Sequence, residues 1–232
     1  MTYYKNSEFK TLRFNEVEST NKLAFELIKA NKAGHYDVIM ANSQTNGRGR
    51  YDRKWESEKG NLYCSLILRL KNNLRITDYS FLAACAIGRA VRNYNIQTKY
   101  KWPNDIFYND KKLAGILIQY QTINNIHFLV IGVGVNIETS PSYATSLLIQ
   151  NIDKNAFLEE FLKSFHFFKT KYQQFGFLAI KNEWKMHAYR INEKITLSDG
   201  KFGVFRDLDQ DGNLLLENSD GKIDKVLSQE IV

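Results

Sequence analysis

The sequence predicts an α+β protein that ends in a small β-rich unit. Short apolar stretches are typical of strands, and longer stretches repeat apolar residues at helical spacing. From residue 193 onward the pattern changes to short strands separated by Asp-Gly pairs, which favour hairpins. The 232 residues, 44% hydrophobic and 13% aromatic, are enough for one substantial domain and a small second one. We expect the domains to span residues 1–188 and 189–232.

The first third of the chain should contain three strands and a helix. Loose alternation over residues 9–17 predicts an edge strand. A helix should follow, because apolar residues share one face up to Gly34. Two more strands are predicted over residues 37–43 and 62–70. The segment between them joins two rigid elements, where functional loops are often found.

The middle of the chain predicts a helix, a hairpin and a buried strand. Helical spacing extends over residues 78–94. Residues 106–108 and 113–120 are expected to pair around a polar turn. Residues 128–135 are almost wholly apolar, as a strand covered on both faces would be.

The last third should contain two helices and then hairpins. Aromatic residues and leucines recur at helical spacing over residues 156–175, and we interpret this stripe as core. A second helix is predicted over residues 177–188. The remaining residues predict a small β-barrel with too little core to stand alone, which should therefore dock on the main domain.

Composition excludes several classes of protein. No apolar run is long enough to span a membrane, and the first ten residues lack the apolar stretch of a secretory signal, so we expect a cytoplasmic protein with no membrane partner. Cys64 and Cys85 lie in apolar stretches without a spacing typical of metal or redox sites. The four histidines form no ligand motif, so no permanently bound metal is expected.

The net charge of +7 favours anionic partners of any kind. We find no zinc-finger spacing and no aromatic-rich ribonucleoprotein motif, and too few residues precede the first predicted strand for a helix-turn-helix. A basic protein that binds single-stranded nucleic acid through Arg48, Arg50 and Trp55 remains an alternative from a different class.

Residues 47–55 form a short basic loop. They contain four cations, one carboxylate, two glycines and a tryptophan. Burying unpaired guanidinium groups costs several kcal/mol each, so this loop must contact water or an anion. Glycines allow positive φ and a close approach to a ligand, and arginine suits carboxylates and phosphates. We therefore favour an anion site, with a solvated hairpin loop as the alternative.

Two polar motifs can be interpreted in two ways. Ser19, Thr20 and Asn21 stand at the start of the first predicted helix, where a simple N-cap is the better interpretation of the motif alone. Asn104 and Asp105 follow a proline at a bend, where a plain turn is as good an interpretation as a ligand contact.

Gly132 and Gly134 lie near the end of the apolar strand. They do not form a dinucleotide fingerprint, because no third glycine follows and no helix begins there. The sequence also lacks a Walker A motif, so a nucleotide would be held differently from the way P-loop proteins hold it. The pair instead predicts a ligand that lies against a central strand.

In their order along the chain, these motifs resemble those of the biotin protein ligases. Each motif is weak alone, but together they are specific. The resemblance implies a catalytic domain with a fold like that of class II aminoacyl-tRNA synthetases, followed by an SH3-like barrel. The matching segments are Ser19-Thr20-Asn21, Gln44-Thr45-Asn46-Gly47-Arg48-Gly49-Arg50, Trp55, Lys101-Trp102-Pro103-Asn104-Asp105, Lys112-Leu113-Ala114-Gly115, Gly132-Val133-Gly134-Val135-Asn136 and Ala144-Thr145-Ser146-Leu147.

The resemblance implies an ATP-dependent, AMP-forming ligase that works in two steps. Biotin and ATP, the latter as its Mg²⁺ complex, would give biotinyl-5′-AMP and pyrophosphate. A lysine of a biotin carboxyl carrier domain, part of a biotin-dependent carboxylase, would then take the biotinyl group. The basic loop would close over the adenylate as a lid, because the mixed anhydride hydrolyses in water.

Regulatory members of this family carry an N-terminal DNA-binding domain. The present chain begins almost at the catalytic region, so we expect a monofunctional ligase without DNA as a partner. A homodimer is compatible with the family. Lipoate ligases and octanoyl transferases share the fold and are the nearest alternatives, although their signature usually contains a histidine and residues 47–55 contain none.

The resemblance also implies roles for individual residues. Arg48 and Lys112 are the expected catalytic residues, because their charges would offset the anions that the reaction brings together. Lys101 and Asp105 would contact the triphosphate, magnesium or the acceptor lysine. Contacts to ATP or the adenylate are expected from Arg48, Arg50, Trp55, Lys112 and Asn136. Contacts to biotin are expected from Ser19, Thr20, Asn21, Gln44, Arg48, Gly49, Arg50, Lys112, Gly115, Gly132 and Gly134.

Overall fold

The computed structural model describes residues 2–6, 8–71, 75–147 and 152–232. The helices are α1 (Thr20–Lys29), α2 (Asp78–Arg92) and α3 (Lys154–Lys185). The first eight strands are β1 (Thr2–Asn6), β2 (Phe9–Val17), β3 (Asp37–Gln44), β4 (Leu62–Leu70), β5 (Lys99–Lys101), β6 (Asp105–Tyr108), β7 (Lys111–Ile123) and β8 (Ile126–Val135). The last four are β9 (Lys194–Thr196), β10 (Phe202–Leu208), β11 (Leu214–Glu217) and β12 (Ile223–Val226).

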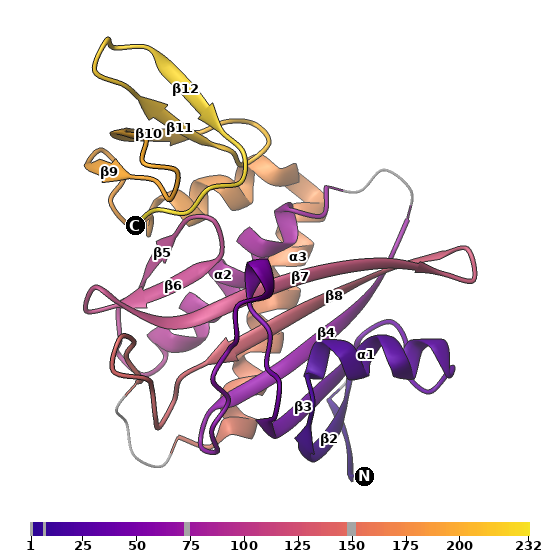
Figure 1. Ribbon diagram of the computed structural model, residues 1–232. Coiled ribbons are helices and arrows are strands. Elements are labelled where there is room, and N and C mark those ends of the chain that lie inside the picture. Colours follow the sequence, from indigo (N-terminus) through magenta and orange to yellow (C-terminus); the bar gives the residue numbers. More distant parts are fainter. Residues whose placement is uncertain (1, 7, 72–74, 148–151) are drawn as a thin grey trace.

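Two sheets organise the chain (Figure 1). The larger is an eight-stranded mixed sheet in the order β1-β2-β3-β4-β8-β7-β6-β5. Strands β2 and β3 run parallel, and the other neighbours are antiparallel. The smaller is a four-stranded antiparallel sheet in the order β12-β11-β10-β9. The predicted α+β class is confirmed.

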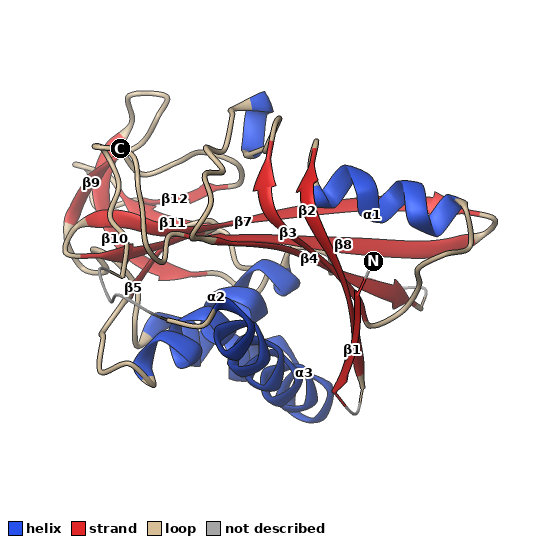
Figure 2. Cartoon of the chain, turned by 90° about the horizontal axis from the view of Figure 1, so that it is seen from below, coloured by secondary structure: helices blue, strands red, loops and turns tan. Residues whose placement is uncertain are grey.

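Helices cover the large sheet unequally (Figure 2). Helices α2 and α3 lie together on one face, and α1 lies on the other. The main core packs between the sheet and the α2–α3 pair, and a smaller cluster packs beneath α1. Among the described residues, no helix is long and apolar enough to cross a membrane.

The prediction that residues 9–17 form an edge strand is wrong. Strand β2 pairs with β3 on one side and with β1 on the other, so β1 is the outermost strand. Backbone hydrogen bonds between antiparallel strands do not require an apolar pattern. The polar first residues of the chain therefore gave no signal of this strand.

The predicted pair of C-terminal helices corresponds to α3, which is interrupted at Gly176. This residue has φ 69° and ψ −173°, a conformation that breaks the helix. The second half ends at Lys185, three residues earlier than predicted, and α2 ends at Arg92 rather than at residue 94. The aromatic stripe of the first half is core from Phe157 to Phe168, as predicted, but the prediction is wrong at Phe175, which is 67% exposed.

The predicted C-terminal hairpins are confirmed, with positive φ at Gly200, Gly212 and Gly221. An isolated bridge between Leu197 and Ile231 brings the end of the chain back to this unit. The unit docks on the large domain through a 3.0 Å hydrogen bond from the indole of Trp102 to the carbonyl of Gly212.

Replacing Gly176 by alanine should destabilise the protein through backbone strain alone. A side chain there would meet no atom within 4 Å, but the backbone conformation is nearly exclusive to glycine. We expect the free energy of unfolding to fall by about 1–3 kcal/mol in chemical denaturation.

Gly34→Ala is the matched control, because it also meets no atom within 4 Å and its φ is not in the positive region. Its free energy of unfolding should stay within about 1 kcal/mol of wild type. Equal losses for the two variants would show that strain at Gly176 is not the cause.

Candidate active site

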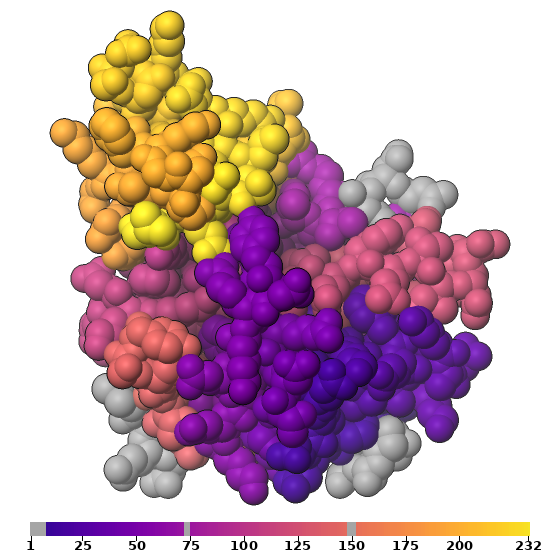
Figure 3. Space-filling view, viewed as in Figure 1, coloured from indigo at the N-terminus to yellow at the C-terminus, as the bar shows by residue number. Residues whose placement is uncertain are grey.

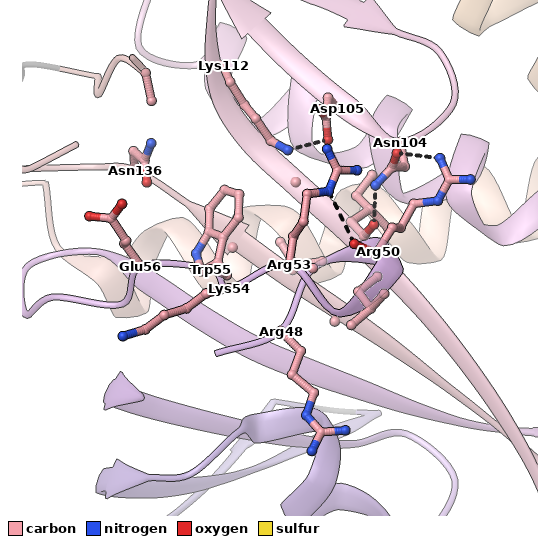
Figure 4. A pocket seen from close by; sticks show the side chains of 18 of the residues that line it. Arg48, Arg50, Arg53, Lys54, Trp55, Glu56, Asn104, Asp105, Lys112 and Asn136 are labelled. Atoms are coloured by element: carbon pink, nitrogen blue, oxygen red, sulfur yellow. Dashed lines mark hydrogen bonds and ion pairs between the residues drawn. The ribbon is translucent and has the colours of Figure 1, made fainter. Parts of the chain in front are cut away.

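A cavity of about 590 Å³ opens on the face of the large sheet that carries α1 (Figure 4). This size is typical of a cleft that binds a small molecule. Its walls come from the start of α1, the basic loop, strands β5 to β8 and the last three residues of the chain. Every residue that the sequence singled out for a site lines this cavity. Their ligands remain predictions.

The floor of the cavity is the glycine pair of β8. A Cβ atom at Gly132 would lie 2.5 Å from Oδ1 of Asn21. At Gly134 it would lie 2.6 Å from Nε1 of Trp55. Glycine is therefore required at both positions because other side chains pack directly on the strand.

One end of the cavity is an uncharged hydrogen-bonding wall. The backbone N–H of Thr20 donates to Oε1 of Gln44 at 2.8 Å, and its hydroxyl donates to the same atom at 3.2 Å. Ser19 stands at the N-cap position of α1, but its side chain makes no capping hydrogen bond. The simple-cap interpretation of this motif is therefore wrong.

Ser65 links the side chains of this wall to one another, and the sequence analysis did not identify it. Its hydroxyl is fully buried and lies 2.8 Å from Oγ1 of Thr20 and 2.6 Å from Oδ1 of Asn21. The amide of Asn21 in turn donates to Oε1 of Gln119 at 2.9 Å. The available signal was a serine within a mostly apolar strand, since a buried hydroxyl needs a partner.

The middle of the cavity is charged. Nζ of Lys112 lies 2.8 Å from Oδ1 of Asp105, an ion pair in which this oxygen is buried without a well-aligned hydrogen bond. Burial lowers the pKa of Lys101, although the charge of Asp105 opposes that shift. Two cations and one carboxylate thus leave this region able to attract a further anion.

The basic loop, residues 47–55, is a small hairpin. Arg48 and Lys54 form an antiparallel bridge, and the backbone N–H of Trp55 donates to the carbonyl of Gly47 at 2.9 Å. The tip, Arg50–Asp52, is a tight turn whose backbone at Tyr51 is not helical. The loop therefore has regular backbone pairing of its own.

The loop glycines do not adopt the positive φ that glycine allows. Gly49 has φ −106°, whereas Tyr51 and Asp52 have φ 54° and 56°. Gly47 is needed for space, because a Cβ there would lie 2.5 Å from the carbonyl oxygen of Trp55. The strained residues are thus at the tip, and the glycine serves close packing at the base.

The arginines of the loop point in different directions (Figure 4). Arg48 points away from Lys112, and its guanidinium lies 4.0 Å from Oε1 of Glu18. Arg50 donates to Oδ1 of Asn104 at 3.3 Å. The structure therefore brings Arg48 and Lys112 to one cavity without bringing their charges together.

Trp55 lies on the floor between the loop and the sheet. A Cβ at Gly115 or Gly134 would come within 3 Å of its ring, and Nζ of Lys112 lies 5.3 Å from the ring centroid. Its indole N–H is buried and has no hydrogen-bond partner among the described residues. Nearby, the buried Asn136 donates to the carbonyl of Thr145 at 3.0 Å.

Comparison with known proteins gives concordant matches. Residues 14–136, more than half of the chain, match the model of the Biotin/lipoate A/B protein ligase family. The chain is 35% identical to the bifunctional ligase/repressor BirA of Bacillus subtilis, over 93% of this chain and 71% of that protein. It is 28% identical to the biotin acetyl-CoA-carboxylase ligase of Paracoccus denitrificans, over 88% of this chain and 93% of that protein. A solved structure of biotin protein ligase from Aquifex aeolicus, in complex with biotin and ATP, aligns with a TM-score of 0.80. The alignment covers 96% of this chain and 97% of that chain, at 26% sequence identity.

Gly134→Ala should displace Trp55 from the floor. The new methyl group would overlap the indole, which lies on a loop rather than in the core, so the ring should move into water. We expect tryptophan emission at longer wavelength and a loss of about 1–3 kcal/mol in the free energy of unfolding.

The same substitution in a Trp55→Phe background isolates the signal, because Trp102 and Trp184 are buried elsewhere. There Gly134→Ala should leave the emission unchanged. An emission shift in both backgrounds would mean that the substitution disturbs the core and not the position of Trp55.

Proposed function

The chain belongs to the biotin/lipoate A/B protein ligase family, and from this premise we propose how its cavity works. The protein is an ATP-dependent biotin protein ligase. Biotin and ATP first give biotinyl-5′-AMP and pyrophosphate, and a lysine of a carrier protein then takes the biotinyl group. Residues 1–188 form the catalytic domain, and residues 189–232 form the accessory unit.

The observation that carries this proposal is the set of side chains gathered in one cavity. An uncharged hydrogen-bonding wall, a group of cations, and the pair Trp55 and Asn136 all line it. Biotin has a polar ring at one end and a carboxylate at the other, and ATP adds phosphates and a base. The cavity thus contains a fitting group for each part of the two substrates.

The hydrogen-bonding wall supports biotin over lipoate. A ureido ring presents two N–H donors and one carbonyl acceptor, and the amides of Asn21 and Gln44 with the hydroxyl of Thr20 can match both kinds of group. A dithiolane ring has no hydrogen-bond donor, and its sulfur atoms are only weak acceptors. A lipoyl group would therefore gain none of the hydrogen bonds that a ureido ring can add to these side chains, and it should bind more weakly by their contribution.

Lys112 is placed to assist the first step. A carboxylate oxygen of biotin attacks the α-phosphorus of ATP, and pyrophosphate leaves with its bonding electron pair. Negative charge accumulates on the phosphorus-bound oxygens, so an ammonium group at the centre of the cavity stabilises the transition state more than the separate substrates. Arg48 lines the same cavity and can join after turning from Glu18, with which it makes only a long, exposed ion pair.

Mg²⁺ would arrive as the complex of ATP. Among the described residues no three metal-binding side chains gather, so the phosphates would supply most of the ligands. The Oδ1 atom of Asp105, buried without a well-aligned hydrogen bond, is a donor of the type that Mg²⁺ prefers. This supports contact between Asp105 and the metal, with Lys101 beside it as a phosphate ligand.

Trp55 and Asn136 are the proposed contacts of adenine. The indole presents a flat face within the cavity, and its unpartnered N–H can donate to an acceptor. The side chain of Asn136 is held by the carbonyl of Thr145, which fixes its direction. A rigid aromatic face with a fixed amide suits a purine, which needs both stacking and a few directed hydrogen bonds.

The second step needs access for a protein amine. The carrier lysine attacks the carbonyl carbon of the mixed anhydride, and AMP leaves. We infer that the acceptor is the carrier protein of acetyl-CoA carboxylase, because the relative from Paracoccus denitrificans is named for that enzyme. A cytoplasmic location follows from the use of ATP and of such a carrier.

The direct test is the mass of a biotin carrier domain after incubation with the enzyme and MgATP. Biotin should add one biotinyl group at a single lysine, and lipoate in a parallel reaction should add nothing. Transfer of lipoate without transfer of biotin would overturn the assignment.

Lys112→Ala should reduce adenylate formation by about 100-fold or more, the usual cost of removing one group that stabilises developing negative charge. The fold should be retained, because this side chain is about one-third exposed. The measurement is release of pyrophosphate that depends on biotin.

Lys111→Ala is the matched control, because the neighbouring lysine has the same charge, is exposed and does not line the cavity. It should retain wild-type adenylation. If Lys112→Ala stays within about threefold of Lys111→Ala, Lys112 does not take part in the first step.

A further inference from the structure

We infer that the C-terminal residues 228–232 complete the active site and that Glu230 is a positioning residue, whose carboxylate fixes the basic loop over the cavity. This inference rests on the proposed function, since its consequence is retention of the adenylate. Glu230, Ile231 and Val232 line the cavity although they belong to the accessory unit. Nothing in the sequence around Glu230 indicated a site.

Glu230 makes ion pairs with two arginines of the loop. Its Oε1 atom accepts a hydrogen bond from Arg53 and lies 3.7 Å from Nη1 of Arg50. The side chains of Arg50 and Glu230 are only 23% and 24% exposed, so their attraction is less screened than at an open surface. The pair with Glu230 also raises the pKa of Arg53.

Glu230 is charged at neutral pH. Partial burial would raise the pKa of its carboxyl, but the pairs with Arg53 and Arg50 outweigh that effect and the pKa is lowered. The carboxylate thus neutralises part of the repulsion between cations that lie close together in the loop.

The tip of the loop is anchored at the same place. The hydroxyl of Tyr51 donates to the carbonyl of Ser228, and Arg50 lies 4.9 Å from the centre of the Tyr51 ring. Figure 3 shows the loop reaching up to the yellow residues at the end of the chain. Side-chain and backbone contacts therefore join the loop tip to the accessory unit.

These contacts hold the tip in a conformation that it would not adopt alone. Tyr51 and Asp52 both have positive φ, which costs energy in residues other than glycine and persists only when surrounding contacts enforce it. The hydrogen bond at Ser228 and the ion pairs at Glu230 are such contacts. Removing the charge of Glu230 should therefore release the strain by letting the loop open.

The anchor extends across the cavity to the large sheet. Arg50 donates to Oδ1 of Asn104, and the amide of Asn104 donates to the carbonyl of Ile116 on β7 at 2.8 Å. Glu230, Arg50 and Asn104 thus form one connected set of contacts from the accessory unit to the cavity wall. A closed loop keeps the reactive anhydride from water and slows its escape.

The test is the dissociation rate of preformed biotinyl-5′-AMP from Glu230→Gln, which keeps the shape of the side chain and removes its charge. We expect release about threefold to tenfold faster than from wild type. Glu230→Asp keeps the charge and should release the adenylate more slowly than Glu230→Gln. Adenylate formation with saturating substrates should change less than its release, because Lys112 is untouched.

Glu217→Gln is the matched control. Glu217 lies in the same small sheet, forms an ion pair with Arg206 and does not line the cavity. Its variant should release the adenylate at the wild-type rate. Release from Glu230→Gln at the wild-type rate or slower would overturn the inference, as would equal acceleration by Glu217→Gln.

A second readout does not depend on the reaction. Without ligands, trypsin should cut Glu230→Gln after Arg50 and Arg53 faster than wild type, and Glu217→Gln should be cut at the wild-type rate. If wild type makes no biotinyl-5′-AMP, the proposed function fails while this measurement still tests the anchor. If wild type makes the adenylate but trypsin cleaves Glu230→Gln at the wild-type rate, the inference about Glu230 is wrong while the proposed function stands.

Discussion

The active cavity depends on the two-fold alternation of strand β8. Its side chains point in turn to opposite faces of the sheet. On the face toward α1, Phe128 and Val130 pack in the core beneath the helix, and the next two positions on that face are Gly132 and Gly134. The same strand therefore supports a helix along one half and opens a ligand cleft along the other. Side chains from α1 and the basic loop can reach its backbone only because no Cβ atom is there.

A second constraint is the pairing of the cations that the cavity requires. Each cation that we propose for the first step has a carboxylate at hand: Lys112 has Asp105, and Arg48 has Glu18. The contact of Arg48 is long and exposed, so a ligand anion can replace it at small cost. The Lys112 pair is shorter and more buried, which keeps that ammonium in place before substrate arrives. Electrostatic preorganisation is thus strongest at the centre of the cavity.

The spacing of apolar residues along the sequence was enough to predict most helices and strands. Helical or two-fold periodicity located the strands, the helices and the aromatic core of α3, because these patterns arise from burial of one face. It failed for β1, where backbone pairing leaves no apolar pattern, and at Ser19, where local propensity suggested a cap. The polar motif at the start of α1 instead contacts another element, because the hydroxyl of Thr20 donates a hydrogen bond to Gln44 on β3.

The sequence by itself determined the fold class, the family and the motifs that line much of the cavity, because each motif is a short run of neighbours with a recognisable pattern. Only the tertiary structure decided what joins these motifs. Ser65 supports Asn21 across 44 positions, and Glu230 meets Arg53 across 177 positions. Such contacts are single side chains without a local pattern, brought together by the order of strands and by the docking of the accessory unit. Which residues these side chains contact depends on the three-dimensional arrangement of the strands and the accessory unit, and the periodicity of the sequence does not contain that information.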